Sequence, residues 1–162
     1  MKSAKLERAL GFREKEKELL TDALRRYPGE SKLWIMLAQH HADAGDVKKA
    51  TDTYKQAVGK CPTSVDLWCC SAMFEANNYK SAARPRSILE VARLKNPKNA
   101  TLWLTAIRIE EKAGADTVAQ QLMAKALQEC PAAGALWAHA IASDARPLRK
   151  VLCAFCHAFA RH

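Results

Sequence analysis

The sequence predicts an all-α protein, a right-handed superhelix of stacked helix-turn-helix repeats. The four tryptophans recur at intervals of 34, 35 and 34 residues, each directly after a leucine. A proline stands six residues before each tryptophan. An interval of 34 residues is typical of helix pairs that stack into a solenoid. The positions that anchor this repeat are Trp34, Trp68, Trp103, Trp137, Pro28, Pro62, Pro97 and Pro131.

The first helix of each repeat is expected around its tryptophan. Leu37 lies four residues after Leu33 and three after Trp34, so the three share one helix face. Gly45 stands eleven residues after the tryptophan and can end this helix by adopting a left-handed backbone conformation. Gly114 has the same place in the third whole repeat.

The second helix of the repeat follows directly. We expect Asp46 to cap it, Pro62 to end it, and Ser64 to cap the next first helix. Its apolar face advances in steps of four, three and four residues, at Ala50, Tyr54, Ala57 and Cys61. Leu89 and Ala92 match this face in the middle repeat, and Ala119, Met123 and Ala126 match it in the third. Pro97 and Pro131 match the helix-ending Pro62.

Pro85 departs from this frame, because it takes a position that is alanine in the other two whole repeats. A proline inside a helix lacks an amide donor and crowds the preceding turn, at a cost of roughly 3 kcal/mol. We therefore predict that this second helix starts late, near Arg84, and that Ala82 and Ala83 belong to the loop.

Both ends of the repeat array look incomplete. Gly11 takes the place of the helix-ending glycine, so the chain begins inside a first helix, and the proline due about 34 residues after Pro131 falls beyond His162. Residues 1–150 are expected to form the solenoid, as a half-repeat, three full repeats and a partial repeat, with a divergent tail at 151–162. The uncovered ends predict self-association. The pattern also suits a fragment or truncated product of a longer array.

Several classes of function find no support in the sequence. No segment is long and apolar enough for a membrane span, and the N-terminal residues lack the apolar region of a signal peptide. No phosphate-binding loop or catalytic constellation is present, so neither an enzyme nor a cofactor is predicted. Glu75, Glu110 and Asp144 each stand seven residues after a tryptophan, and Glu7 fits the same position of the implied half-repeat. These repeated acids are expected to pair within the stack.

Cysteine and histidine residues are possible metal or haem ligands by their side-chain chemistry. The run from Cys153 to His157 matches a haem-attachment pattern, but that chemistry needs export. A structural zinc site usually joins two separated ligand pairs, so zinc is also disfavoured. The adjacent His40 and His41 point in different directions and are expected at the surface or in a groove. Buried thiols without disulfides are expected at Cys61, Cys69, Cys70 and Cys130.

The net charge of +9 is uneven, with +5 in the stretch from residue 80 to residue 98 and a further +4 from Arg146 to Arg161. The first stretch holds the candidate interaction residues. Its cations, opposed by Glu90 alone, are Lys80, Arg84, Arg86, Arg93, Lys95 and Lys98. They form a candidate basic interaction surface for an acidic protein or RNA. The competing interpretation is a solvated helix face, which the lack of any RNA-binding motif favours.

Two repeat families share this period. The run from Gly45 to Pro62 resembles the tetratricopeptide (TPR) repeat, whereas Leu67-Trp68 with Glu75 and Leu102-Trp103 with Glu110 look like the half-a-TPR (HAT) repeat. Longer runs resemble the HAT array of the pre-mRNA-processing factor six family over about residues 1–150. These runs are Ser87–Asn99 followed by Leu102-Trp103-Leu104, Leu122–Pro131 and Ala145-Arg146-Pro147.

This resemblance implies a protein–protein scaffold of nuclear pre-mRNA splicing, in the spliceosomal tri-snRNP. Its implied partners are snRNP proteins, and it implies no cofactor and no catalytic residue. Two alternatives stay open: a generic TPR-type adaptor that binds peptides outside splicing, and a non-functional truncated product.

Overall fold

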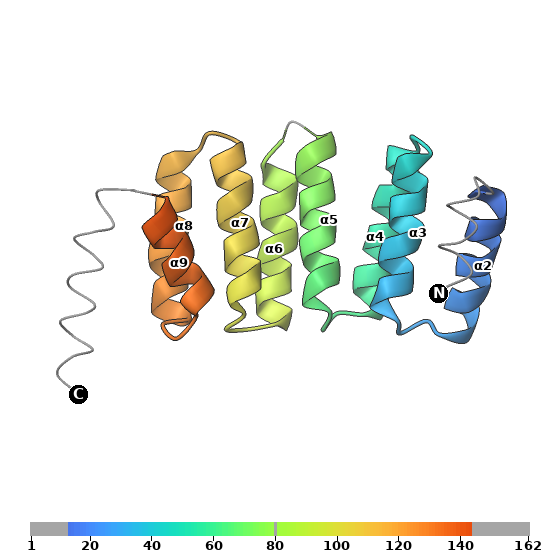
Figure 1. Ribbon diagram of the computed structural model, residues 1–162, viewed down its shortest axis with the longest axis horizontal. Helices are drawn as coiled ribbons and strands as arrows, with labels where there is room; N and C mark the ends of the chain where they lie inside the picture. Colours follow the sequence, from blue (N-terminus) through green and yellow to red (C-terminus); the bar gives the residue numbers. More distant parts are fainter. Residues whose placement is uncertain (1–12, 80, 144–162) are drawn as a thin grey trace. The chain divides into compact units, whose positions relative to one another are not determined.

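The computed structural model describes residues 13–79 and 81–143, and every regular element in these ranges is an α-helix, as predicted (Figure 1). The helices divide between two compact units, residues 1–95 and 96–162. The first unit holds α2 (Arg13–Arg26), α3 (Ser31–Asp43), α4 (Val47–Lys60), α5 (Val65–Asn78) and α6 (Ala83–Lys95). The second unit holds α7 (Ala100–Lys112), α8 (Asp116–Glu129) and α9 (Gly134–Ala142). The expected tail at 151–162 lies outside the described residues, so its boundary stays a prediction.

The first unit is built from two complete helix pairs, α3 with α4 and α5 with α6. Each first helix also contacts the second helix that precedes it, and α3 contacts α5. The apolar clusters lie at these junctions: one joins Leu20, Leu24 and Leu33, and the other contains Tyr54 and Leu67. A buried leucine contributes roughly 1.5–3 kcal/mol. The core is therefore a row of junctions between successive helices.

The second unit has the same construction. Helix α7 packs against α8, and α9 contacts both. Its core cluster contains the residues that the sequence frame assigned to a repeat interior, including Trp103, Met123 and Leu136. Met123 occupies the position that Tyr54 has in α4, and both are buried. The frame thus tolerates different large side chains at one site.

Two of the first helices end as predicted, at a left-handed glycine. Gly45 has φ 81° and Gly114 has φ 73°. The amide of Gly45 donates to the carbonyl of Ala42 at 2.9 Å, and the next amide, of Asp46, donates to that of His41 at 2.9 Å. This pair of bonds satisfies carbonyls that the helix end leaves open. Helix α5 ends differently, because the residue after Asn78 is Tyr79 in extended conformation.

The predicted side-chain caps at Asp46 and Ser64 are wrong. Both residues take the backbone position of an N-cap, but neither side chain accepts a capping hydrogen bond. The Asp46 carboxylate instead accepts from Lys49, and this bond holds its pKa below the usual range. A side-chain cap does occur at Asn99, whose Oδ1 accepts from the amide of Thr101 at 3.0 Å.

The predicted late start of the helix containing Pro85 is confirmed. Helix α6 begins at Ala83 and has 13 residues, against 14 in α4 and α8. Pro85 therefore lies in the first turn, where amides have no acceptor inside the helix and a missing donor costs little. Its ring is buried. One detail differs: Ala83 is the first helical residue, and only Ala82 stays in the loop.

Candidate functional site

The six-residue spacing between proline and tryptophan has a structural reason. The indole N–H of Trp68 donates to the carbonyl of Pro62 at 2.9 Å, and the same bond joins Trp34 to Pro28. In the second unit Trp137 donates to the carbonyl of Pro131 at 2.7 Å. Each bond fastens a first helix to the end of the helix before it. These tryptophan side chains therefore stabilise the packing of successive helices and do not form the binding surface.

The repeated acids are buried where the structure describes them. Glu75 is 4% exposed and Glu110 is 1% exposed. The guanidinium of Arg84 lies 3.4 Å from the Glu75 carboxylate and 4.6 Å from the centre of the Tyr79 ring. Glu75 thus pairs within the stack, as predicted, and links the end of α5 to the start of α6. The other two acids, Glu7 and Asp144, lie outside the described residues.

One exposed face recurs on the first helices, and the sequence reasoning missed it. Its residues, which we call the first-helix face, are Lys32, Gln39 and Asp43 on α3, Asp66, Met73 and Asn77 on α5, and Thr101, Arg108 and Lys112 on α7. In each helix they follow one another at steps of seven and four, so they share one side of the helix. The signal was present in the sequence, since these positions keep the 34- and 35-residue frame.

In the first unit this face combines apolar and polar groups. Met73 is 52% exposed at its centre, between Asp66 and Asn77. Ile35, half-buried, lies on the same side of α3 as Gln39. Because α3 and α5 are in contact, the two stripes are neighbours. An exposed apolar residue with a polar rim is the composition of a protein interface.

The predicted basic surface is divided by the geometry of α6. Arg84 and Lys95 are eleven residues apart, which is three turns, so they share one flank of the helix. Arg86 and Arg93 are two turns apart and lie on the opposite flank. The buried strip between the flanks contains Pro85, Leu89 and Ala92. Lys98 belongs to the second unit, and Lys80 lies outside the described residues.

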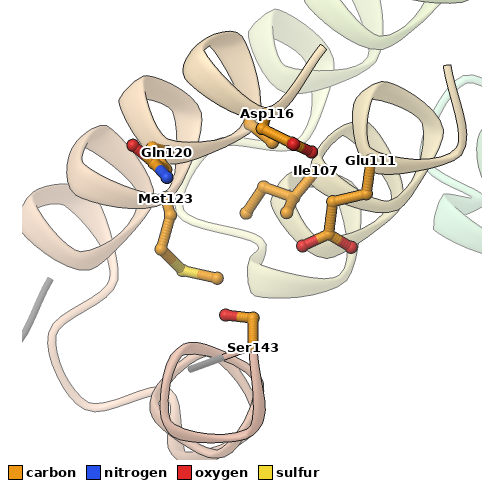
Figure 2. Close-up of a pocket in the computed structure, with 7 residues that line it drawn as sticks. Ile107, Glu111, Asp116, Gln120, Met123 and Ser143 are labelled. Carbon is orange, nitrogen blue, oxygen red and sulfur yellow. The ribbon is translucent and has the colours of Figure 1, made fainter. Parts of the chain in front are cut away.

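A small cleft opens in the second unit, with a volume of about 270 Å³. Figure 2 shows Glu111 of α7, Met123 of α8 and Ser143 after α9 around one space. The rest of its lining is Ile107, Asp116, Ala119 and Gln120. His139 Nε2 lies 3.4 Å from the Glu111 carboxylate. Nothing in this lining forms a nucleophile–base pair, so the cleft adds no candidate catalytic site.

The predicted buried thiols are largely confirmed. Cys61, Cys69 and Cys130 are buried, and Cys70 is half-buried. Burial raises the pKa of Cys61, Cys70 and Cys130, which keeps these thiols protonated and unreactive at neutral pH.

The surface position expected for His40 is wrong. Its ring is 6% exposed, and Nε2 lies 2.8 Å from the carbonyl oxygen of Arg13, which ties α3 to α2. The cysteine-rich segment that carries the haem-attachment pattern and the possible zinc ligands lies outside the described residues. Within residues 13–79 and 81–143, no three His, Cys, Asp or Glu side chains are placed to hold a metal ion. In the same ranges no helix has the length and apolarity to span a bilayer.

Comparison with known proteins identifies two kinds of relative. A family model described as the PRP39 N-terminal HAT repeat matches residues 8–94. The chain is 40% identical over 111 residues to Pre-mRNA-splicing factor prp1 of Schizosaccharomyces pombe, covering 68% of this chain and 12% of that protein. It is 28% identical over 118 residues to Pre-mRNA-splicing factor 6 of Saccharomyces cerevisiae, covering 73% and 13%. The chain spans about an eighth of the length of these relatives.

Similar solved structures include two that are described as TPR proteins. The crystal structure of MamA has a TM-score of 0.54 at 17% identity, covering 81% of this chain and 76% of that one. The Thermus thermophilus TPR protein TTC0263 has 0.52 at 20% identity, covering 80% and 72%. YrrB, described as a TPR protein with an unusual peptide-binding site, has 0.55 at 16% identity, covering 84% and 70%. At these identities the likeness establishes the helical-repeat fold alone.

Proposed function

The chain belongs to the family of PRP39 N-terminal HAT repeats, and from that membership we propose that it is a protein–protein scaffold of pre-mRNA splicing. The observation that carries the proposal is the 40% identity to a splicing factor over 68% of the chain. The resemblance drawn from the repeat motifs is confirmed by the same relatives. Partners among the spliceosomal snRNP proteins, a place in the tri-snRNP and a nuclear location follow as parts of the proposal.

The fold supports a scaffold function because residues of the repeat frame bond to one another inside the stack, while another surface of the helices is exposed. The tryptophans and Glu75 are committed to contacts within the stack. The first-helix face is left to meet a partner, with Met73 at its centre in the first unit. Within the first unit this face recurs on α3 and α5, which are in contact, and faces repeated on stacked helices provide a binding surface. We propose that partner binding, without catalysis, is the activity of this face.

The test is affinity purification from nuclear extract with the whole chain as bait. The variant Met73→Glu places a charge at the centre of the first-helix face. Ile141→Glu is the matched control, because Ile141 is 70% exposed on α9 and lies outside that face. We expect the wild-type chain and the control to recover splicing proteins, and Met73→Glu to recover at least tenfold less, the loss typical of a central interface residue.

A peptide-binding adaptor outside splicing is the second candidate, and the resemblance of the run from Gly45 to Pro62 to the TPR repeat favours it. The same purification separates the two functions. Recovery of chaperones or other proteins with no splicing component would replace the scaffold proposal with the adaptor. Recovery of no partner by any of the three chains would favour a truncated product without function.

A further inference from the structure

The three second helices of the first unit all end in a cation. Arg26, Lys60 and Lys95 are the last residues of α2, α4 and α6, and each stands two residues before a repeat proline. Their intervals of 34 and 35 residues match the tryptophan frame, and all three side chains are exposed. We propose that this C-terminal row binds an acidic segment of a partner protein.

A second set of cations lies three turns earlier on the same helices. Its members are Lys15, Lys49 and Arg84, and each is eleven residues before a member of the C-terminal row. These charges are engaged within the chain. Lys49 pairs with Asp46, Arg84 pairs with Glu75, and Lys15 also has an internal interaction. By contrast, no carboxylate of the described residues pairs with the C-terminal row.

Helix stability does not account for the C-terminal row. A cation at a helix C-terminus interacts favourably with the helix dipole, so each could simply stabilise its own helix. Helix α8 has Glu129 at the equivalent last position and is still 14 residues long, as α4 is. The frame therefore does not require a cation there. The row is a property of the first unit alone among the described helices.

The neighbours of the C-terminal row favour an acidic protein over RNA. Tyr27 follows Arg26 and is 66% exposed, and Leu94 precedes Lys95 and is 82% exposed. Mixed apolar and cationic groups suit a protein segment that carries both acidic and apolar side chains. Single-stranded RNA is usually bound by stacking successive bases on aromatic rings. No aromatic ring accompanies Lys60 or Lys95 at the position that Tyr27 has beside Arg26.

The inference goes beyond the splicing proposal, and its test uses a defined probe. Binding of poly-L-glutamate to the whole chain is measured at low salt by fluorescence anisotropy. The test variant combines Arg26→Gln, Lys60→Gln and Lys95→Gln. The charge-matched control combines Lys48→Gln, Lys55→Gln and Lys125→Gln, three exposed lysines on second helices outside the row. Circular dichroism checks that both variants keep the helicity of the wild-type chain.

We expect the row variant to bind poly-L-glutamate roughly tenfold more weakly than the wild-type chain, and the control to lose at most about twofold. Equal losses in both variants would overturn the proposal, because binding would then follow net charge. Stronger, row-dependent binding of poly-uridylate would also overturn it in favour of RNA. Recovery of splicing proteins by the wild-type chain and by Met73→Glu is measured in a separate experiment, so either proposal can fail while the other stands.

Discussion

The two complete helix pairs of the first unit follow one sequence frame but close their turns by different means. In α3–α4, a left-handed glycine, Gly45, reverses the chain with two backbone hydrogen bonds. In α5–α6, the equivalent residue is Tyr79 in an extended conformation. There the turn is spanned by side chains, with Arg84 over the Tyr79 ring and beside the Glu75 carboxylate.

This difference shows that the turn between the two helices of a repeat can be closed either by backbone hydrogen bonds or by side-chain contacts. The buried acid of the second pair, Glu75, has His41 as its counterpart in the first pair. Burial lowers the pKa of His41, so that ring is mainly neutral near pH 7. A turn closed by glycine needs no charged partner, whereas a buried carboxylate requires one. The buried acid alone does not replace the glycine, since α7 combines the buried Glu110 with the left-handed Gly114. In the second pair it is Arg84 that links the Glu75 carboxylate and the Tyr79 ring across the turn.

The largest expected effect concerns the tryptophans of the two pairs. Trp68 is 6% exposed and Trp34 is half-buried, although each donates the same bond to a proline carbonyl. We expect Trp68→Ala to lower the free energy of unfolding by roughly 3–5 kcal/mol, because it leaves a cavity. The loss for Trp34→Ala should be clearly smaller. Urea denaturation measures both, and equal losses would mean that the bond, rather than burial, dominates.

An intermediate effect is expected at the side-chain cluster of the second pair. Arg84→Ala leaves the Glu75 carboxylate buried without this cation, and we expect a loss of roughly 1–2 kcal/mol in unfolding free energy. Lys95→Ala on the same flank of α6 is the control and should stay within about 0.5 kcal/mol. Adding Glu75→Gln completes a double-mutant cycle. A coupling energy near zero would show that the pair does not hold the turn.

The smallest expected effects on stability are those of substituting two glycines of the first pair. Neither Gly45 nor Gly59 has an atom within 4 Å of an added Cβ, so only backbone conformation distinguishes them. Gly45→Ala forces a left-handed alanine and should cost about 1 kcal/mol. Gly59→Ala lies inside α4 and should stabilise by roughly 0.5–1 kcal/mol. Thermal denaturation of both variants tests the sign, and two shifts in the same direction would contradict this account.

Much of the fold could be predicted because the repeat is encoded locally. The tryptophan interval predicted the alternation of first and second helices that the described residues show, and Gly45 and Pro85 marked a helix end and a late helix start. The side-chain caps were mispredicted because Asp46 had a nearby alternative partner, Lys49. The first-helix face was missed because exposure depends on which side of each helix its neighbours cover. The spacing of its residues could be read from the sequence, but their exposure to solvent could not.

The sequence by itself determined the helical period, the glycine helix ends at Gly45 and Gly114, and the family of this chain, since these depend on residues close together or repeated in register. The tertiary structure alone decided which groups meet across helices. It buried His40 against the carbonyl of Arg13, placed Arg84 beside Glu75, and left Arg26, Lys60 and Lys95 without a partner among the described carboxylates. The physical reason is that burial and pairing are set by the packing of neighbouring helices, which local propensity does not specify.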